Sequence, residues 1–225
     1  GTSWTDAFTK VQDAIFKAIP GDTIWVAKGA YRPTSSYAVA GGSAARTYTF
    51  IIDSNTVIYG GFNGTETNLN QRDIALNLTE LTGDIGVPVT ATDNSYHVVT
   101  ILNSTKNSII DGFRIRDGYA NGTNSIYPST FRGGALYLAY DSLNTGRPFF
   151  KNCEFTNNLA AKGGAIYVSQ FFKSDAKTSF LKCTFSQNYS FNNLYGEGGG
   201  AIYVAASNGN NGPYGTVSLL IDSCL

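Results

Sequence analysis

The C-terminal half of the chain repeats one pattern of apolar and polar positions. The segment Asn152–Asn158 (NCEFTNN) returns as Lys182–Asn188 (KCTFSQN), and a more divergent copy precedes both at Gly112–Gly118 (GFRIRDG). Apolar and polar residues alternate within each copy, which is the pattern of a strand with one buried face. The copies therefore predict a repeat architecture built from strands.

A second motif follows each complete copy. It consists of two glycines, an alanine, an aliphatic residue, a tyrosine and another aliphatic residue, and it begins at Gly133, Gly163 and Gly199. The paired glycines suit a tight corner, because glycine accepts a positive φ and close backbone approach. Each unit is expected to hold a strand, a turn, a second strand and a loop. The units differ in length, so we expect inserted loops at two places. One lies after the turn that ends the first motif, and the other lies after the tyrosine-containing strand.

Alignment of the copies on their cysteines puts like residues into shared columns. One column holds Phe113, Cys153, Cys183 and Cys224, and another holds Gly118, Asn158 and Asn188. A single unit cannot bury its own apolar face, but stacked units can, if each strand pairs in parallel with its equivalent one coil away. We therefore predict an all-β fold, a right-handed parallel β-helix solenoid. The cysteines should form an internal ladder without disulfides and the asparagines a second ladder at a turn. The rival fold, a β-sandwich, would need antiparallel hairpins with short, regular turns.

The N-terminal segment follows a helical period instead. Residues 3–19 carry apolar side chains at i, i+3, i+4 and i+7 spacing, with a capping-box pattern at Ser3–Asp6 and a stop at Pro20-Gly21. We predict one domain over residues 1–225, in which residues 1–21 form a capping α-helix and residues 22–225 form the coils. In the first coils, strands are predicted at Asp22–Ala27, Tyr48–Ile52, Thr56–Tyr59, Thr79–Thr82, Tyr96–Leu102 and Ser108–Ile110, with loops at 33–46 and 62–78.

Charge and composition narrow the range of partners. Basic and acidic side chains number 16 each, so the net charge is zero and no basic face for nucleic acid is expected. No apolar run of about 18 residues is present, so we expect no membrane insertion by this segment. The chain has no Met and ends within a further copy of the repeat at Ser223-Cys224-Leu225. We therefore expect a chain truncated at its C-terminus, with an open coil that favours end-to-end self-association.

Several stretches resemble known β-helix proteins. The opening Pro20–Val26, followed by Gly29-Ala30-Tyr31, resembles the start of pectate-lyase-like proteins. The stretch Tyr59–Thr67, with Leu81–Ile85, is similar to large secreted or surface β-helix proteins of gliding and gut-dwelling bacteria. The pairing of Gly-Gly-Ala-Ile with Phe-x-x-Asn is similar to the polymorphic outer-membrane adhesins. The adhesin resemblance implies attachment at an extracellular or cell-surface location, whereas the lyase resemblance implies polysaccharide cleavage.

Residues with recognisable catalytic chemistry are few. Arg114 and Arg116 should point outward from one strand, with Glu154 one coil away in the same column, where a solvated ion pair is expected. We expect no outward cluster of three carboxylates, and this weakens both the lyase and the glycosidase interpretation. The single histidine, His97, lies in a strand pattern without a nucleophile motif, so a structural role is expected.

The favoured function is a non-catalytic secreted or cell-surface module for adhesion, which binds an extracellular glycan or a host or cell-surface protein. The alternative is a polysaccharide lyase or glycoside hydrolase that acts in the β-helix groove. Ligand contacts are predicted at the outward basic pair Arg114 and Arg116, which suits an anionic sugar or an acidic partner. Further contacts are predicted at Tyr119, Tyr127 and Tyr195 in the inserted loops, although packing of these loops on the solenoid wall explains the tyrosines equally well.

No catalytic residue, metal ligand or cofactor is predicted. Calcium is the one candidate ion. The run Asn208–Gly212 could chelate it, but a flexible loop accounts better for that composition.

Overall fold

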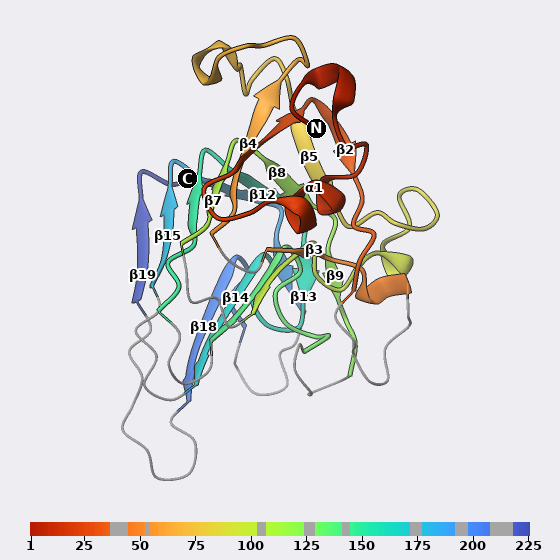
Figure 1. Ribbon diagram of the computed structural model, residues 1–225. Helices are drawn as coiled ribbons and strands as arrows, with labels where there is room; N and C mark the ends of the chain where they lie inside the picture. Colours follow the sequence, from red (N-terminus) through yellow and green to blue (C-terminus); the bar gives the residue numbers. More distant parts are fainter. Residues whose placement is uncertain are drawn as a thin grey trace.

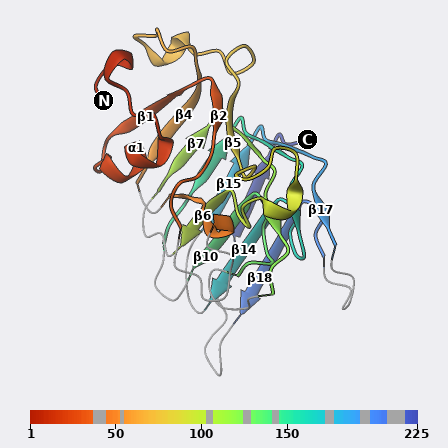
Figure 2. The same cartoon turned by 90° about the vertical axis from the view of Figure 1, so that its right-hand side faces the viewer.

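The chain forms a parallel β-helix solenoid, as predicted (Figure 1). The structure, a computed structural model, describes residues 1–36, 45–52, 55–102, 107–123, 129–140, 145–171, 177–191, 198–207 and 218–225. Within these residues the strands form four sheets, and every strand in a sheet runs parallel to its neighbours. From β7 onward the chain passes through the four sheets in turn in each coil, whereas the described residues of the first two coils add no strand to the three-stranded sheet. Strands of successive coils lie side by side (Figure 2).

The sheets are numbered here in the order in which the chain visits them. Sheet 1 comprises β1 (Thr23–Ala27), β4 (Val57–Phe62), β7 (Ile109–Asp111), β11 (Phe149–Lys151), β15 (Lys177–Leu181) and β19 (Ser218–Asp222). Sheet 2 comprises β2 (Gly29–Tyr31), β5 (Thr79–Thr82), β8 (Arg114–Arg116), β12 (Glu154–Thr156) and β16 (Thr184–Ser186). Sheet 3 comprises β9 (Tyr119–Ala120), β13 (Leu159–Ala160) and β17 (Tyr189–Ser190). Sheet 4 comprises β3 (Phe50–Ile51), β6 (Val99–Leu102), β10 (Leu136–Tyr140), β14 (Ile166–Phe171) and β18 (Ile202–Ser207).

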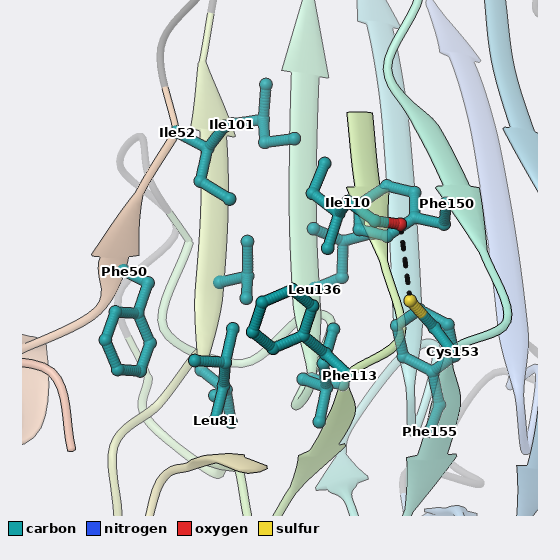
Figure 3. Close-up of a cluster of buried hydrophobic side chains, with 14 of the residues drawn as sticks. Phe50, Ile52, Leu81, Ile101, Ile110, Phe113, Leu136, Phe150, Cys153 and Phe155 are labelled. Atoms are coloured by element: carbon teal, nitrogen blue, oxygen red, sulfur yellow. Dashed lines mark hydrogen bonds between the residues drawn. The ribbon is translucent and has the colours of Figure 1, made fainter. Parts of the chain in front are cut away.

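The core consists of the inward side chains of these sheets, arranged in columns along the solenoid axis (Figure 3). Phe150 stacks on Phe180 with ring centroids 5.1 Å apart, and Phe155 stacks on Phe185 at 5.0 Å. These distances match the spacing of neighbouring parallel strands, about 4.8 Å, because like residues occupy the same position in each coil. The predicted alternation of buried and outward positions is thereby confirmed for the repeated strands.

The predicted cysteine ladder is also confirmed. Cys153 and Cys183 are buried, Cys224 is partly buried, and all three thiols are free. The Cys153 thiol donates to the carbonyl oxygen of Ile110 at 3.4 Å (Figure 3). Burial raises the pKa of the Cys153 thiol well above its usual value. The column therefore acts as a row of small apolar side chains at the corner between sheets 1 and 2.

An asparagine ladder fixes the corner between sheets 2 and 3. Asn158 is fully buried, and its Oδ1 accepts a hydrogen bond from the backbone N–H of Gly118 at 3.0 Å. Its Nδ2 donates to Asn188 Oδ1 at 3.0 Å, and the same oxygen accepts from the Asn158 backbone N–H at 3.1 Å. Each amide thus links one coil to the next. The residue before the ladder has a positive φ in each coil, at Asp117, Asn157 and Gln187.

The first two glycine pairs behave as the sequence predicts, whereas Gly199 of the third pair does not adopt a positive φ. Gly133 and Gly163 have φ values of +63° and +64°, which side chains rarely adopt. Gly134 and Gly164 lie against backbone carbonyl groups of the next coil, so that a β-carbon on Gly164 would meet Gly200 O at 2.2 Å. The first glycine is therefore needed for the turn and the second for the close stacking of coils.

The N-terminal helix is shorter than predicted. Residues 3–19 form a 3₁₀ turn at Trp4–Asp6 and the helix α1 at Val11–Lys17, separated by extended backbone at Ala7 and Lys10. The predicted capping box is wrong, because the Ser3 side chain makes no capping hydrogen bond. The remaining 3₁₀ turns lie at Ala45–Thr47, Leu69–Gln71 and Ala91–Asp93.

The break in the helix has a packing reason. The Trp4 indole donates to the carbonyl oxygen of Glu66 at 2.8 Å and its ring lies against Trp25 and Phe62 on the side of the solenoid. Val11 and Ile15, in contrast, are buried in the main core at its end. One straight helix cannot place its two ends on these two surfaces.

The capping role of α1 is confirmed by its contacts with the first coil. Gln12 is almost fully buried, and its Nε2 donates to the carbonyl oxygen of Ile51 at 3.2 Å while its Oε1 accepts from the Ile51 N–H at 2.8 Å. The side-chain amide therefore satisfies the outer edge of β3, as a neighbouring strand would. At the opposite end of the solenoid, β16 to β19 are the last strands of their sheets, and Leu220 and Ile221 are each 48% exposed. Self-association through this end stays a prediction.

The strand β2 at Gly29–Tyr31 was not predicted, and β4 ends at Phe62 instead of Tyr59. Three further predictions of strand position are corrected. The first concerns the short strands of sheet 3, which the sequence pattern did not indicate because they have only two residues each. The second is β3, which covers only Phe50–Ile51, since the preceding Tyr48 pairs with Ser36 in an isolated antiparallel bridge. The third is β6, which begins at Val99 instead of Tyr96. No helix in the described part of the chain has the length and apolar character needed to cross a membrane.

Replacement of Cys153 by Asp should lower the free energy of unfolding by about 3 kcal/mol or more, because it buries an unpaired carboxylate. Urea unfolding followed by circular dichroism measures this loss. Cys224→Asp serves as a matched control in the same column, and its effect should be much smaller because Cys224 is only partly buried. Equal losses in the two variants would contradict the ladder.

Replacement of Asn158 by Ala should cost about 3 kcal/mol, because it removes one acceptor and leaves buried backbone groups without partners. The Asn158 Nδ2 also donates to the carbonyl oxygens of Ile115 and Thr156. The exposed Asn70 provides the control, Asn70→Ala, whose unfolding midpoint should stay close to that of the native chain. A similar midpoint for both variants would show that the amide ladder contributes little.

Candidate functional site

The outer face of sheet 2 carries a column of alternating charges. The parallel register places Arg114 between Glu80 of the preceding coil and Glu154 of the following coil. Outward side chains in one column are separated by about 4.8 Å, so opposite charges in successive coils meet directly. The ion pair predicted between Arg114 and Glu154 is confirmed, with Nε and Oε2 at 2.6 Å.

Glu80 holds both arginines. Its Oε1 lies 3.3 Å from Arg114 Nη1 and 3.0 Å from Arg116 Nε, and its Oε2 accepts from Arg116 Nη2 at 3.2 Å. The contact with Arg116 is therefore bidentate, which fixes the plane of that guanidinium group. The side chain of Glu80 is only 16% exposed, against 30% for Arg116, so the carboxylate forms the inner part of the network.

Asp117 closes the network at the corner after β8. Its positive φ turns the chain toward sheet 3 and directs the carboxylate back toward Arg116 Nη1, with which it forms an ion pair. Asp117 also accepts hydrogen bonds from Thr82 Oγ1 at 3.2 Å and from Asn157 Nδ2 at 2.6 Å. The site is thus held by backbone corners and by side chains from three successive coils.

These residues line an open depression of about 510 Å³ on the solenoid surface. Glu80, Asp117 and Glu154 supply three carboxylates, and Arg114 and Arg116 supply two guanidinium groups. Three carboxylates therefore line one depression, but each is paired with an arginine, and this differs from the free cluster of carboxylates that the lyase interpretation would need. Both arginines, which were predicted to suit an anionic sugar or an acidic partner, already bind carboxylates, and the formal charge of the five side chains is −1.

The network favours a protonated Arg116. Partial burial alone would lower its pKa, but the hydrogen bonds and negative charges of Glu80 and Asp117 outweigh that effect and raise the pKa. A guanidinium group in this setting cannot serve as a general base, because a base must lose its proton near the working pH. Arg116 is thus suited to an orienting and hydrogen-bonding role.

Tyr119, one of the three predicted tyrosines, does not join this site. Tyr119 lies on β9, not in an inserted loop, and its ring packs edge-on against Phe191 with centroids 6.0 Å apart. Its carbonyl oxygen accepts a hydrogen bond from Arg46 Nη2 at 2.6 Å. Tyr119 therefore packs on the solenoid wall, which was the alternative explanation. Tyr127 and Tyr195 lie outside the described residues, as does the Asn208–Gly212 run.

His97 has the expected structural position. It is buried, its Nδ1 lies 2.9 Å from the carbonyl oxygen of Gly133, and its ring stacks on Tyr137 with centroids 5.0 Å apart. Burial lowers the pKa of His97 to about 4, and the backbone hydrogen bonds of Gly133, Ser129 and Arg132 offset this effect only in part. The imidazole is therefore neutral at physiological pH. Its hydrogen bond with the Gly133 carbonyl group links it to the coil that contains Gly133.

Two residues of the site were missed by the sequence analysis. Glu80 occupies the outward position of a strand that was predicted correctly, and Asp117 lies in a copy that was recognised. An alignment of Leu81 with Ile115 would have placed Glu80 beside Arg114, as the register does. Across the described part of the chain, no three His, Cys, Asp or Glu side chains are grouped so that they could hold a metal ion.

Comparison with known proteins supports a surface-associated repeat. Residues 152–169 and 182–205 match the Chlamydia polymorphic membrane protein repeat. No curated protein and no solved structure matches the chain. The two matched segments run from β12 into β14 and from the corner before β16 into β18, so the similarity covers the repeated strands themselves. The match and the parallel sheets together fit a β-helix-like outer-membrane protein and support a cell-surface location in general.

Acidification should destabilise the fold through His97. The folded-state pKa, about 4, lies below the usual value of 6.5, so the unfolded chain takes up this proton first as the pH falls. The stability that depends on neutral His97 is complete above pH 6.5 and is lost progressively down to pH 4, by about 3 kcal/mol in total. Unfolding free energies of the native chain and of His97→Gln, measured between pH 7 and pH 4, give this contribution as a difference. A difference that does not change with pH would contradict the buried, neutral imidazole.

Proposed function

We propose that the chain is a non-catalytic surface module that attaches to carbohydrate or protein ligands. The observation that carries the proposal is the match of two coils to a repeat of surface-associated membrane proteins. A rigid stack of coils presents the same outward positions again and again, which suits many weak contacts acting together on a cell surface.

The ligand contacts of this module are assigned to the depression on sheet 2. It is the place where charged groups of three coils converge, and the Glu80, Arg114 and Glu154 side chains are held in defined positions by one another. Binding sites need such preorganised polar groups, because ordering flexible side chains on binding lowers the affinity.

A second candidate is a polysaccharide-cleaving enzyme, favoured by the three carboxylates beside two arginines. Two features of the same site oppose it. Arg116 is held protonated by Glu80 and Asp117 and therefore cannot remove a sugar proton. Glu80 and Glu154 are also separated by Arg114, which bridges them, and so they do not face each other across an open space as the two carboxylates of a glycosidase do.

Removal of both arginines tests the proposed function. Arg114→Ala with Arg116→Ala should reduce attachment to a panel of immobilised glycans and cell surfaces roughly tenfold, since arginines that anchor a ligand each contribute more than about 1 kcal/mol. The fold should persist, because partly exposed ion pairs contribute about 0–1 kcal/mol each. Surface plasmon resonance and circular dichroism measure the two effects.

The matched control removes two exposed cations from the N-terminal cap, Lys10→Ala with Lys17→Ala, and should leave attachment unchanged. Equal attachment by both double variants would show that the binding face does not lie on sheet 2. Calcium-dependent release of unsaturated oligosaccharides from a uronic-acid polymer, lost in the arginine variant, would establish the enzyme instead.

A further inference from the structure

The depression on sheet 2 offers a paired donor and acceptor to solvent. Arg114 uses Nε and Nη1 for its carboxylate contacts, and Glu154 uses Oε2. In the part of the chain that the structure describes, Nη2 of Arg114 and Oε1 of Glu154 are not engaged in a hydrogen bond. Both side chains are about a third exposed, at 32% and 34%. A donor and an acceptor are therefore held side by side by the 2.6 Å bond between the two groups.

The charge of the depression argues against an anionic ligand. Three carboxylates surround two guanidinium groups, and the other residues that line the depression, Thr156, Asn157 and Gln187, are neutral. An anion would have to displace Glu80 or Glu154 from an arginine, or else bind against a net negative charge. A neutral ligand meets neither cost.

The lining also argues against a protein partner. It contains no apolar or aromatic side chain, whereas protein interfaces depend on apolar anchors that fill pockets near their centre. Hydroxyl groups, in contrast, both donate and accept, so one hydroxyl can accept from Arg114 while its neighbour donates to Glu154. Asn157 and Gln187 add amide groups of the same dual character.

The geometry points to a neutral, hydroxyl-rich saccharide as the ligand of this depression, bound through adjacent hydroxyls by Arg114 and Glu154. The inference rests on the proposed function and names the ligand class of its site. The volume of about 510 Å³ lies within the range of small-ligand sites. Because no aromatic ring lines the depression, a single site should bind weakly, with a Kd on the order of 1 mM, and repeated presentation would supply the strength of attachment.

The Glu154→Gln variant separates the two charge classes of ligand, because its effect has opposite signs for them. It raises the charge of the site from −1 to zero and weakens the hydrogen bond that orients Arg114. Binding of a neutral saccharide should fall about fivefold, as a charged hydrogen bond is replaced by a neutral one. Binding of an anionic saccharide should instead become tighter.

Isothermal titration with the neutral disaccharides lactose, maltose and cellobiose, and with digalacturonate as the anion, measures both effects. We expect at least one neutral disaccharide to bind with an affinity that hardly changes between low and physiological salt, because no ion pair forms. Asp222→Asn, a carboxylate change on sheet 1, is the control and should leave binding unchanged. Equal unfolding midpoints for Glu154→Gln and the native chain would confirm that the fold is intact.

Two outcomes would overturn this ligand class and leave the proposed function standing. One is tighter binding of digalacturonate than of any neutral sugar, strengthened further by Glu154→Gln. The other is attachment of the chain to cell surfaces that no saccharide competes with, which would indicate a protein partner. Absence of attachment to any glycan or cell surface would overturn the proposed function itself.

Discussion

The whole molecule depends on the in-register, parallel stacking of coils. Parallel pairing keeps each residue next to its equivalent in the neighbouring coil. The same type of side chain can therefore recur at one position along the whole solenoid axis. Inside, this produces rows of stacked phenylalanines and of thiols, and at one corner it produces the amide ladder of Asn158 and Asn188. A charged or oversized inward residue would therefore disturb the packing of its equivalents in the neighbouring coils as well as its own.

The same constraint creates the charged network on the outer face of sheet 2. Outward residues also stack in columns, and a column of like charges would repel along its length. The chain avoids this by placing Arg114 between Glu80 and Glu154, each of which comes from a different coil. The network is thus a direct product of register, and a shift of one residue in any of the three strands would turn its charged side chain inward.

The repeated half of the fold could be predicted well because its columns are visible in the sequence. Cysteines, glycines and the Phe-x-x-Asn spacing all mark the same positions, and the structure keeps them in register. The first coils were harder, since long insertions such as the one between Thr82 and Asn94 hide the alignment. Glu80 was missed for that reason, although its strand was predicted correctly.

Other errors came from interactions that a local pattern cannot contain. The apolar stripe of residues 3–19 fits one helix, yet Trp4 and Val11 pack on different surfaces and the helix divides between them. Tyr119 was assigned to a loop because a strand of two residues leaves no periodic signal. The contacts of Glu80 with the two arginines were equally hidden, because they join residues 34 and 36 positions apart in a part of the chain where the repeat is hard to align.

The side chain of Gln12 protects one edge of sheet 4 at the N-terminal end of the solenoid. Its amide occupies both the N–H and the carbonyl group of Ile51, so β3 has no free backbone group there to template another strand. Sheet 4 can therefore be extended only beside β18, at the far face of the molecule. Addition of a strand beside β3 would first have to displace the Gln12 side chain, which protects this edge as a covering strand or loop does in other sheet proteins.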